Sequence, residues 1–489
     1  MKLQAAVHRT VAEREEMGRE ARARTDHALH TGWVPAADRP DPVALLEKQN
    51  TTRDPDLVPV RHGRMMVSPF TFYRGTATVM ATDLAATPNA GLDVQLCGDA
   101  HLSNFGAYAS PERQLVFDLN DFDETLPGPF EYDVKRMAAS FTIAARNNQF
   151  SKADARAATL ASVRAYREAM ASFAASGTMD LWYAKMSEDD LRAGIADVRK
   201  QRLDADAKAK KGTRRADTKA VDKAAKVADS TLAKAHTRTS LQALSKLVEV
   251  VDGKQRIVSQ PPVLVPLREL DAHYGGTPEE LEAMVHKQFA EFRSSLPEVR
   301  RQLIDRFKIV DVARKVVGVG SVGTRAFVAL LEGRDEGDPL FLQVKEATRS
   351  VLEAHLPKSR FAEPGERVVH GQQLMQSASD IFLGWSEGAR DADRHYYWRQ
   401  LRDMKGSAVV ETMIPLGLNW YAGICGWTLA RAHARSGDAV ALAAYLGTKG
   451  RFDKAIADFA ERYADQNELD YQEFLNAIHD GRIEAREGI

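Results

Sequence analysis

The sequence predicts a mixed α+β protein of two lobes, with a sheet-rich lobe inserted between helical segments. Between residues 246 and 407 the chain has short β-branched runs separated by Gly and Pro, such as VLVPL, RAFVALL, LFLQVK and HYYWRQ. Amphipathic helical patterns precede and follow this region. With 489 residues and 44% hydrophobic residues, the chain is long enough for more than one core.

These patterns divide the chain into four parts. Residues 1–60 are a helix-forming start followed by a Pro-rich stretch (35–59) that we expect to be an extended connector. The others are a helical lobe (61–245), the sheet-rich lobe (246–407) and C-terminal helices that complete the helical lobe (408–489).

Inside the helical lobe, two short apolar runs, Val94–Cys97 and Leu115–Leu119, predict strands around the polar segment GDAHLSNFG. The apolar stripe of Glu131–Asn147 predicts a core helix. Further helices are expected near the C-terminus, at Tyr421–Arg435, Ala439–Leu446, Phe452–Tyr463 and Tyr471–Ile478.

The charge balance favours neither a polyanion nor a membrane as partner. Lys plus Arg (67) and Asp plus Glu (68) nearly cancel, and no run approaches the roughly 18 apolar residues of a membrane span. The basic stretch 199–238 has interleaved Asp and no aromatic residues, so we expect a solvated helical pair and not nucleic-acid binding. Cys97 and Cys425 lie in apolar surroundings, which suits a reducing compartment, and we expect a cytoplasmic protein.

A glycine-rich segment, VVGVGSVGTRAFVALLEG, places Gly318, Gly320 and Gly323 between two strand-like runs. A dinucleotide-binding fingerprint would need a helix directly after the third glycine, but residues 325–331 are strand-like. A hairpin whose backbone amides close over phosphates is the kinase arrangement, and it needs a lysine on the next strand. Lys345 in LFLQVKEA meets this need, and a plain glycine-rich hairpin is the alternative interpretation.

A second signal is GDAHLSNFG, in which Asp99 and Asn104 are five positions apart. With this spacing in a kinase catalytic loop, the aspartate orients or deprotonates the acceptor hydroxyl and the asparagine holds Mg²⁺. Another carboxylate must then bind the metal, because one carboxylate cannot both accept a proton and hold the ion. Asp118, Asp121 and Asp123 are the candidates.

The segment GDAHLSNF resembles the catalytic loop of aminoglycoside phosphotransferases and related small-molecule kinases. NDFDETLPGPFEYD resembles their metal-binding segment, in which a second aspartate follows the metal ligand by about a dozen residues. Asp133 follows Asp121 by twelve residues, so the resemblance assigns Mg²⁺ to Asp121 together with Asn104.

Over nearly its whole length the chain also resembles the bacterial DUF2252 family, a domain of unknown function, through SPFTFYRG, GDAHLSNFG, NDFDET, KVVGVGSVGTR, LQVKEA and RQLRDMKGS. That resemblance implies no substrate. The kinase-like elements occur in reversed order, since the catalytic loop precedes the glycine-rich hairpin by more than two hundred residues. Catalysis depends on geometry and not on chain order, so we predict a protein-kinase-like two-lobed fold that is circularly permuted.

Two consequences of the permuted fold can be checked. A glutamate on the helix after the lysine strand should pair with Lys345, and Glu366 is the first candidate with Glu353 second. The helix Tyr421–Arg435 should end near Val94, because the helix after the hinge leads into the catalytic loop.

The expected function is an ATP- and Mg²⁺-dependent phosphotransferase, with Asp99, Asn104 and Asp121 as catalytic residues and a small-molecule or protein acceptor that the sequence does not identify. Nucleotidyl transfer and a catalytically inactive nucleotide-binding regulator use the same cleft and stay open. A metal-dependent phosphoesterase fits less well, because it needs more histidines. The roles of His101 and Arg74, and the oligomeric state, also stay open.

Overall fold

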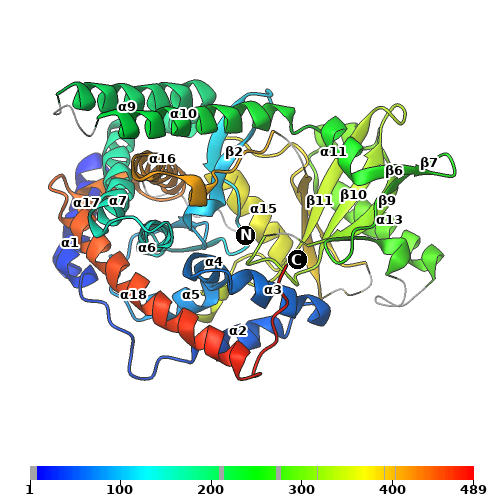
Figure 1. The fold of residues 1–489 in the computed structure, drawn as a ribbon, viewed down its shortest axis with the longest axis horizontal. Helices are drawn as coiled ribbons and strands as arrows, with labels where there is room; N and C mark the ends of the chain where they lie inside the picture. The colour runs from blue at the N-terminus through cyan, green and yellow to red at the C-terminus, as the bar shows by residue number, and fades with distance from the viewer. Residues whose placement is uncertain are drawn as a thin grey trace.

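The computed structural model describes residues 8–208, 214–270, 277–316, 318–389, 391, 393–401 and 404–488. Figure 1 shows helices gathered at one end of the molecule and the largest sheet at the other, with the N-terminal helices α2 to α5 below the region between them. The mixed α+β class predicted from the sequence is confirmed.

The helical part is formed by both ends of the chain. Its α-helices are α1 (Val11–Arg24), α2 (Pro42–Asn50), α3 (Val58–Met65), α4 (Pro69–Gly75), α5 (Ala77–Ala85), α6 (Glu131–Asn147), α7 (Lys152–Ala175), α8 (Thr178–Tyr183), α9 (Glu188–Lys208), α10 (Arg214–Thr237), α16 (Pro415–Ala434), α17 (Ala439–Leu446) and α18 (Arg451–His479). Short strands carry its polar loops: β1 (Asp93–Leu96), β2 (Phe105–Ala109), β3 (Leu115–Leu119), β4 (Leu126–Pro129) and β5 (Met186–Ser187).

The sheet part contains a six-stranded antiparallel sheet in the order β12-β13-β11-β10-β9-β8. Its strands are β8 (Leu264–Pro266), β9 (Lys308–Lys315), β10 (Ala326–Glu332), β11 (Pro339–Ala347), β12 (Gly384–Glu387) and β13 (His395–Gln400). A separate hairpin, β6 (Val248–Val251) with β7 (Lys254–Ile257), and the helices α11 (Ser240–Leu247), α13 (Pro278–Ser295), α14 (Glu298–Ile304) and α15 (Pro364–Met375) complete this part.

Alternation along β10 gives the sheet two apolar faces. Ala329 and Leu331 pack with residues of α13 and α14, whereas Val328 and Leu330 pack with residues of α11. This follows from the two-residue period of a strand, which sends successive side chains to opposite faces. The sheet is therefore covered by helices on both faces. Helix α15 lies between β11 and β12 in sequence, and it packs on β12 and β13.

Helix α6 lies at the centre of the helical part. It has the bounds predicted from its apolar stripe, and buried residues occupy the helix almost throughout. The long helices α7, α16 and α18 pack on α6 or on each other, so both ends of the chain share one core. The C-terminal helices α16 and α18 therefore pack in the same core as α6 and α7.

Two local predictions need correction. The Pro-rich stretch is not extended throughout: Pro42 occupies the first turn of α2, where a missing N–H costs nothing, and Asp41 caps the helix. The last two expected helices form the single helix α18, because residues 464–470 contain neither Gly nor Pro and continue the helical hydrogen bonding.

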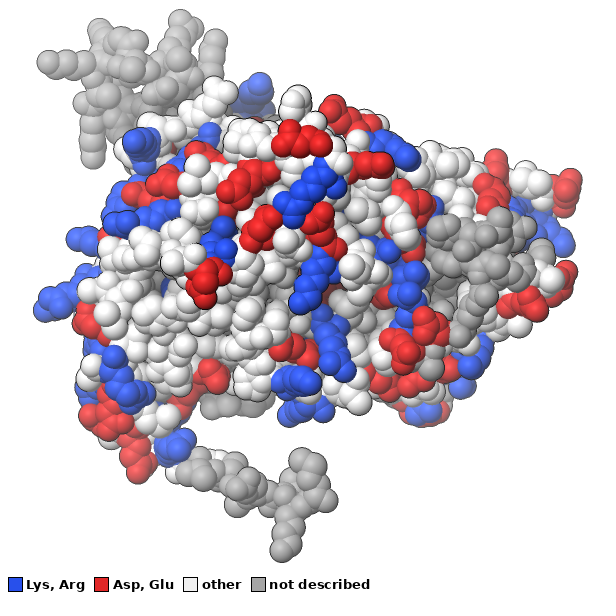
Figure 2. All heavy atoms as spheres, turned by 90° about the horizontal axis from the view of Figure 1, so that it is seen from below, with Lys and Arg blue, Asp and Glu red and all other residues white. Residues whose placement is uncertain are grey.

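The surface is mixed in charge. The basic stretch around residues 199–238 lies mainly on α9 and α10, which pack as a helical pair, as predicted. Acidic and basic side chains are interspersed over the face drawn in Figure 2. No helix in the described ranges has the length and apolar character needed to cross a membrane.

Candidate functional site

A polar cavity of about 500 Å³ is lined by segments from five regions of the sequence. They are the N-terminal helices, the GDAHLSNFG loop, the glycine-rich hairpin, the end of β11, and the Asp-rich loop, which contributes Asp121, Asp123 and Glu124. Asp99, Asn104 and Asp121 line it together with Gly318 and Gly320. The structure thus brings together most of the residues that the sequence singled out.

Asp99 is held by Arg136, and His101 lies nearby. The Nε atom of Arg136 on α6 donates to Asp99 Oδ1 at 2.8 Å, and His101 Nε2 lies 3.7 Å from Asp99 Oδ2. Burial raises the pKa of Asp99 above its ordinary value, although Arg136 opposes this. Burial and the charges of Arg74 and Arg136 lower the pKa of His101, so His101 is neutral near pH 7. Asp99 is therefore a partly exposed carboxylate of fixed orientation and increased basicity.

The rest of the GDAHLSNFG loop is fixed from behind. Asn104 Nδ2 donates to the carbonyl of Asp99 at 2.8 Å, which leaves the amide oxygen as the group that can meet a ligand in the cavity. On α6, Asp133 accepts from the backbone N–H groups of Cys97 at 2.8 Å and Gly98 at 3.0 Å. Asp133 thus anchors the loop that carries Asp99 and Asn104.

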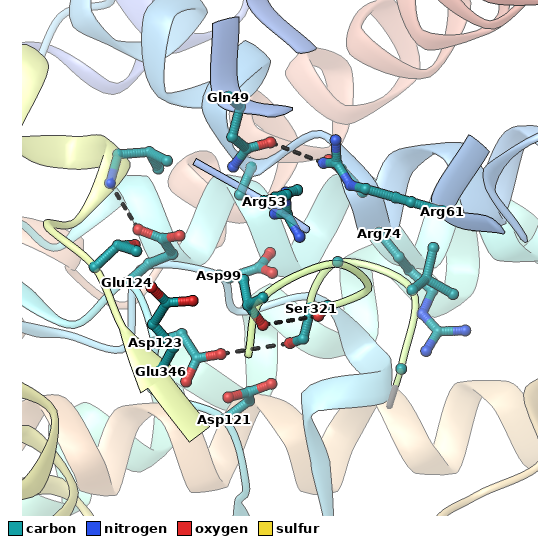
Figure 3. A pocket seen from close by; sticks show the side chains of 18 of the residues that line it. Gln49, Arg53, Arg61, Arg74, Asp99, Asp121, Asp123, Glu124, Ser321 and Glu346 are labelled. Atoms are coloured by element: carbon teal, nitrogen blue, oxygen red, sulfur yellow. Dashed lines mark hydrogen bonds between the residues drawn. The ribbon is translucent and has the colours of Figure 1, made fainter. Parts of the chain in front are cut away.

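Asp121 and Asp123 meet Lys345 across the two parts of the molecule (Figure 3 shows the two carboxylates). Lys345 Nζ lies 3.3 Å from Asp121 Oδ1 and 2.6 Å from Asp123 Oδ2. Tyr397 stands opposite Lys345 on β13, and its hydroxyl donates to Asp123 Oδ1 at 2.7 Å. Two partly buried carboxylates therefore share one buried ammonium, and Asp123 also accepts from the phenol of Tyr397.

The electrostatics of this group follow from like charges at short range. Burial and the neighbouring Asp123 raise the pKa of Asp121, whereas Lys345 and Tyr397 hold the pKa of Asp123 below its ordinary value. The two carboxylates raise the pKa of Lys345, which keeps the ammonium charged. A cation that joined the carboxylates would relieve their repulsion and free Lys345 for another anion.

The glycine-rich hairpin joins β9 to β10. Gly318 and Gly323 have φ angles of 63° and 87°. Residues with a Cβ adopt such backbone angles only with strain, so both positions favour glycine. Gly320 does not need a positive φ, but a Cβ there would lie 3.2 Å from the carbonyl oxygen of Arg74. Ser321 at the tip donates to Asp123 Oδ2 at 3.4 Å, so the hairpin reaches the carboxylates.

The predicted partner of Lys345 is corrected by the structure. Glu366 lies on α15, but its carboxylate pairs with His370 at 3.7 Å, one turn further along the helix. Glu353 caps its own short helix through Ser350. Lys345 has Asp121 and Asp123 as its ion-pair partners instead, because the Asp-rich loop lies directly against β11.

Arg367, next to Glu366 on α15, is buried and contacts the Asp-rich loop. It donates to the carbonyl oxygens of Thr125, Asp123 and Thr348 at 2.5, 2.7 and 2.8 Å. Through these bonds α15 fixes the Asp-rich loop. The sequence does not predict this role of Arg367. Its acceptors are backbone carbonyl oxygens, which every residue has, so no particular partner residue can be recognised.

Asp118, the third candidate metal ligand, has a structural role. It is fully buried, pairs with Arg431 on α16, and accepts from the N–H and hydroxyl of Ser377. It does not line the cavity. This agrees with the choice of Asp121 over Asp118.

Asn104, Asp121 and Asp123 offer the oxygen donors that Mg²⁺ prefers. No group of three or more His, Cys, Asp or Glu residues arranged to hold a metal exists among the residues that the structure describes. Mg²⁺ commonly takes one or two carboxylates and completes its shell with water and substrate phosphates, so two carboxylates and an amide are sufficient. These oxygen atoms fit Mg²⁺. Asp123 was one of the three candidate metal ligands in the sequence, but the sequence assigned the metal to Asp121.

Comparison with known proteins gives one match. The model of the family described as "Uncharacterized protein conserved in bacteria (DUF2252)" matches residues 53–477. The chain belongs to this family. Comparisons with curated proteins and with solved structures gave no match.

Proposed function

We propose that the protein is an ATP- and Mg²⁺-dependent phosphotransferase with a circularly permuted, protein-kinase-like fold. The observation that carries the proposal is the ion pairing of Lys345 with Asp121 and Asp123, which are separated from it by more than two hundred residues. Asp99 and the glycine-rich hairpin line the same cavity. This arrangement supports a triphosphate bound between the lysine, the carboxylates that would hold the metal and the candidate base.

The order of elements along the chain, together with one contact between α16 and β1, supports the proposed fold. The glycine-rich hairpin is followed by the lysine strand β11, then by α15, β12, β13 and α16. At the end of α16 the Ser436 hydroxyl accepts from the backbone N–H of Gln95 on β1 at 2.9 Å, beside the expected neighbour Val94. Following the chain from β9 to α16, and then crossing to β1, gives the succession of parts found in an unpermuted kinase.

Each residue has a role that suits its surroundings. Lys345 would bind the α- and β-phosphates, and the backbone of residues 318–323 would cover them. Asn104 and Asp121, with Asp123, would hold Mg²⁺, which neutralises charge developing on the phosphates. Asp99 would receive the proton of the acceptor hydroxyl, because its pKa is raised and Arg136 fixes its orientation.

Nucleotide binding can be tested with one matched pair of lysine variants. Lys345→Ala removes the ammonium that pairs with Asp121 and Asp123, whereas Lys308→Ala changes an exposed lysine on β9 of the same sheet, paired with Glu332. We expect millimolar ATP with Mg²⁺ to raise the melting temperature of the wild type and of Lys308→Ala, but not of Lys345→Ala.

The same melting experiment can refute the proposal. Equal shifts for Lys345→Ala and the wild type would remove Lys345 from the site, and no shift of the wild type would reject nucleotide binding.

A further inference from the structure

One wall of the cavity carries arginines that lack acidic partners. Arg53, Arg61 and Arg74 line it, and none of them forms an ion pair with a described carboxylate. Arg61 is fully buried and Arg53 is 8% exposed. Buried cations are normally paired, because burying an isolated charge is costly. The absence of such partners indicates an anionic ligand.

The hydrogen bonds of these arginines leave donors unused. Arg53 donates one bond, to the carbonyl of Val322 in the hairpin at 2.5 Å. Arg61 donates to Gln49, Asn50 and the carbonyl of Gly75. The Nε atoms of all three arginines are buried without a partner in the described part of the chain. Buried donors of this kind are satisfied in most folded proteins, and an anion bound in the cavity would supply acceptors for these arginines.

Glu124 lines the cavity and is the acid whose charge acts most on Arg53, but no ion pair joins the two among the described residues. The other carboxylates of the cavity have cationic partners of their own. Asp99 is paired with Arg136, and Glu346 with Arg394 and Arg325. Asp121 and Asp123 share Lys345. Lys48, exposed on α2, adds a further cation on the arginine side of the cavity. The site therefore has one acidic and one basic end.

The pKa values agree with this division. Burial lowers the pKa of Arg53 to about 10 and lowers that of Arg74, with only partial compensation from Glu124 at Arg53 and from Glu411 and Asp99 at Arg74. A dianion between these arginines would offset the cost of burying them.

Figure 3 shows Asp99 between Arg53 on one side and Asp121 and Asp123 on the other. The candidate base therefore separates the proposed metal site from the arginines. A molecule whose anionic group lies on the arginines could present a neighbouring hydroxyl to Asp99.

We propose that the acceptor is a small molecule with a phosphate monoester, held by Arg53, Arg61, Arg74 and Lys48, and a hydroxyl directed at Asp99. This inference rests on the proposed function. The hydroxyl oxygen forms a bond to the γ-phosphorus of ATP, and the bond from that phosphorus to the β,γ-bridging oxygen breaks. ADP leaves with the electron pair, and the hydroxyl proton passes to Asp99. A phosphate monoester carries up to two negative charges and three terminal oxygens that can accept hydrogen bonds from guanidinium groups.

The test is calorimetric titration of the full-length protein with inorganic phosphate as the probe. The titration is done with and without saturating Mg²⁺ and a non-hydrolysable ATP analogue, whose own affinity is measured first. The variants are Arg74→Gln, the exposed Lys48→Gln in case Arg74→Gln fails to fold, and Arg462→Gln on α18 as a control outside the cavity.

Support requires that phosphate binds alongside the nucleotide analogue, that Arg74→Gln weakens phosphate binding at least tenfold and Lys48→Gln severalfold, and that Arg462→Gln has no effect. Competition between phosphate and the analogue would assign the arginines to the phosphates of ATP, and would overturn this inference while leaving the proposed function intact. Absent phosphate binding, or binding that neither cavity variant alters, would also overturn it. Phosphate binding without any nucleotide binding would overturn the acceptor role together with the proposed function.

Discussion

At the scale of single residues, Asp99 is distinguished from the other acids of the cavity by its partners. Asp121 and Asp123 contact Lys345, whereas Asp99 contacts Arg136 and, more loosely, His101. Arg136 itself is held by the carbonyl of Tyr73 at 2.8 Å and lies over the Tyr73 ring. This rigid support suits a base whose geometry must be fixed before the acceptor arrives.

Asp99→Asn should retain Mg²⁺-dependent ATP binding and lose turnover by about 10²- to 10⁴-fold, the usual contribution of a general base. Because the pKa of Asp99 is raised, the wild-type rate should fall as the pH drops through this raised value and Asp99 becomes protonated. Calorimetry with ATP and a pH–rate profile measure the two effects. If Asp99→Asn abolished ATP binding while Asp121→Asn left it intact, the two roles would be reversed.

Sequence spacing predicted which residues lie in or beside the cavity better than it predicted their partners. Asp99, Asn104, Asp121 and Lys345 were identified because each belongs to a short pattern, and they line or adjoin one cavity. Glu366 was assigned by its position on a helix, but the side of a helix that faces a site depends on tertiary packing.

The positions of Arg53 and Arg61 in the cavity could not be predicted either, because they too depend on tertiary packing. Arg53 and Arg61 lie in a segment without a motif, and they become significant only when α2 and α3 are folded against the hairpin.

At the scale of elements, α6 joins core packing to the site. Its inward residues Asp133 and Arg136 hold the GDAHLSNFG loop, while its first residue, Glu131, is fully buried and accepts from the N–H of Ala90 at 2.7 Å. Burial raises the pKa of Glu131 to about 7, and nearby Lys135 only partly opposes this.

Glu131 should make stability depend on pH. Below pH 4.5 the carboxyl is protonated in both the folded and the unfolded chain. Between pH 4.5 and about 7 the unfolded chain releases the proton and the folded chain keeps it, so the free energy of unfolding falls as the pH rises. The pKa difference corresponds to on the order of 3 kcal/mol. Lys135, whose pKa burial lowers to about 8, stays largely protonated in this range.

Glu131→Gln should remove most of this pH dependence, because a glutamine can still accept from the Ala90 N–H without a charge. Urea unfolding of the wild type and the variant at pH 5 and pH 7 measures the difference, with the exposed Glu20→Gln as control. An equal fall in the unfolding free energy of wild type and Glu131→Gln would contradict the raised pKa.

At the scale of the whole molecule, the central feature is that distant segments converge. The spacing of apolar residues in the sequence predicted α6 and the strands of the main sheet, because these elements are long or regularly patterned. The continuous α18 and the helical α2 were missed, since boundaries depend on capping and packing. The meeting of α16 with β1 was predicted from the permuted order and is confirmed by the contact between Ser436 and Gln95.

The most direct test of phosphoryl transfer is to follow labelled ATP. The protein is incubated with Mg²⁺, a metabolite extract of bacterial cells and ATP labelled at either the γ- or the α-phosphate, with Asp99→Asn as control. We predict that the γ-label passes to a small acceptor and ADP accumulates, and that Asp99→Asn shows neither. Transfer of the α-label with release of pyrophosphate, or no transfer of either label while ATP binds, would contradict the proposed phosphotransferase.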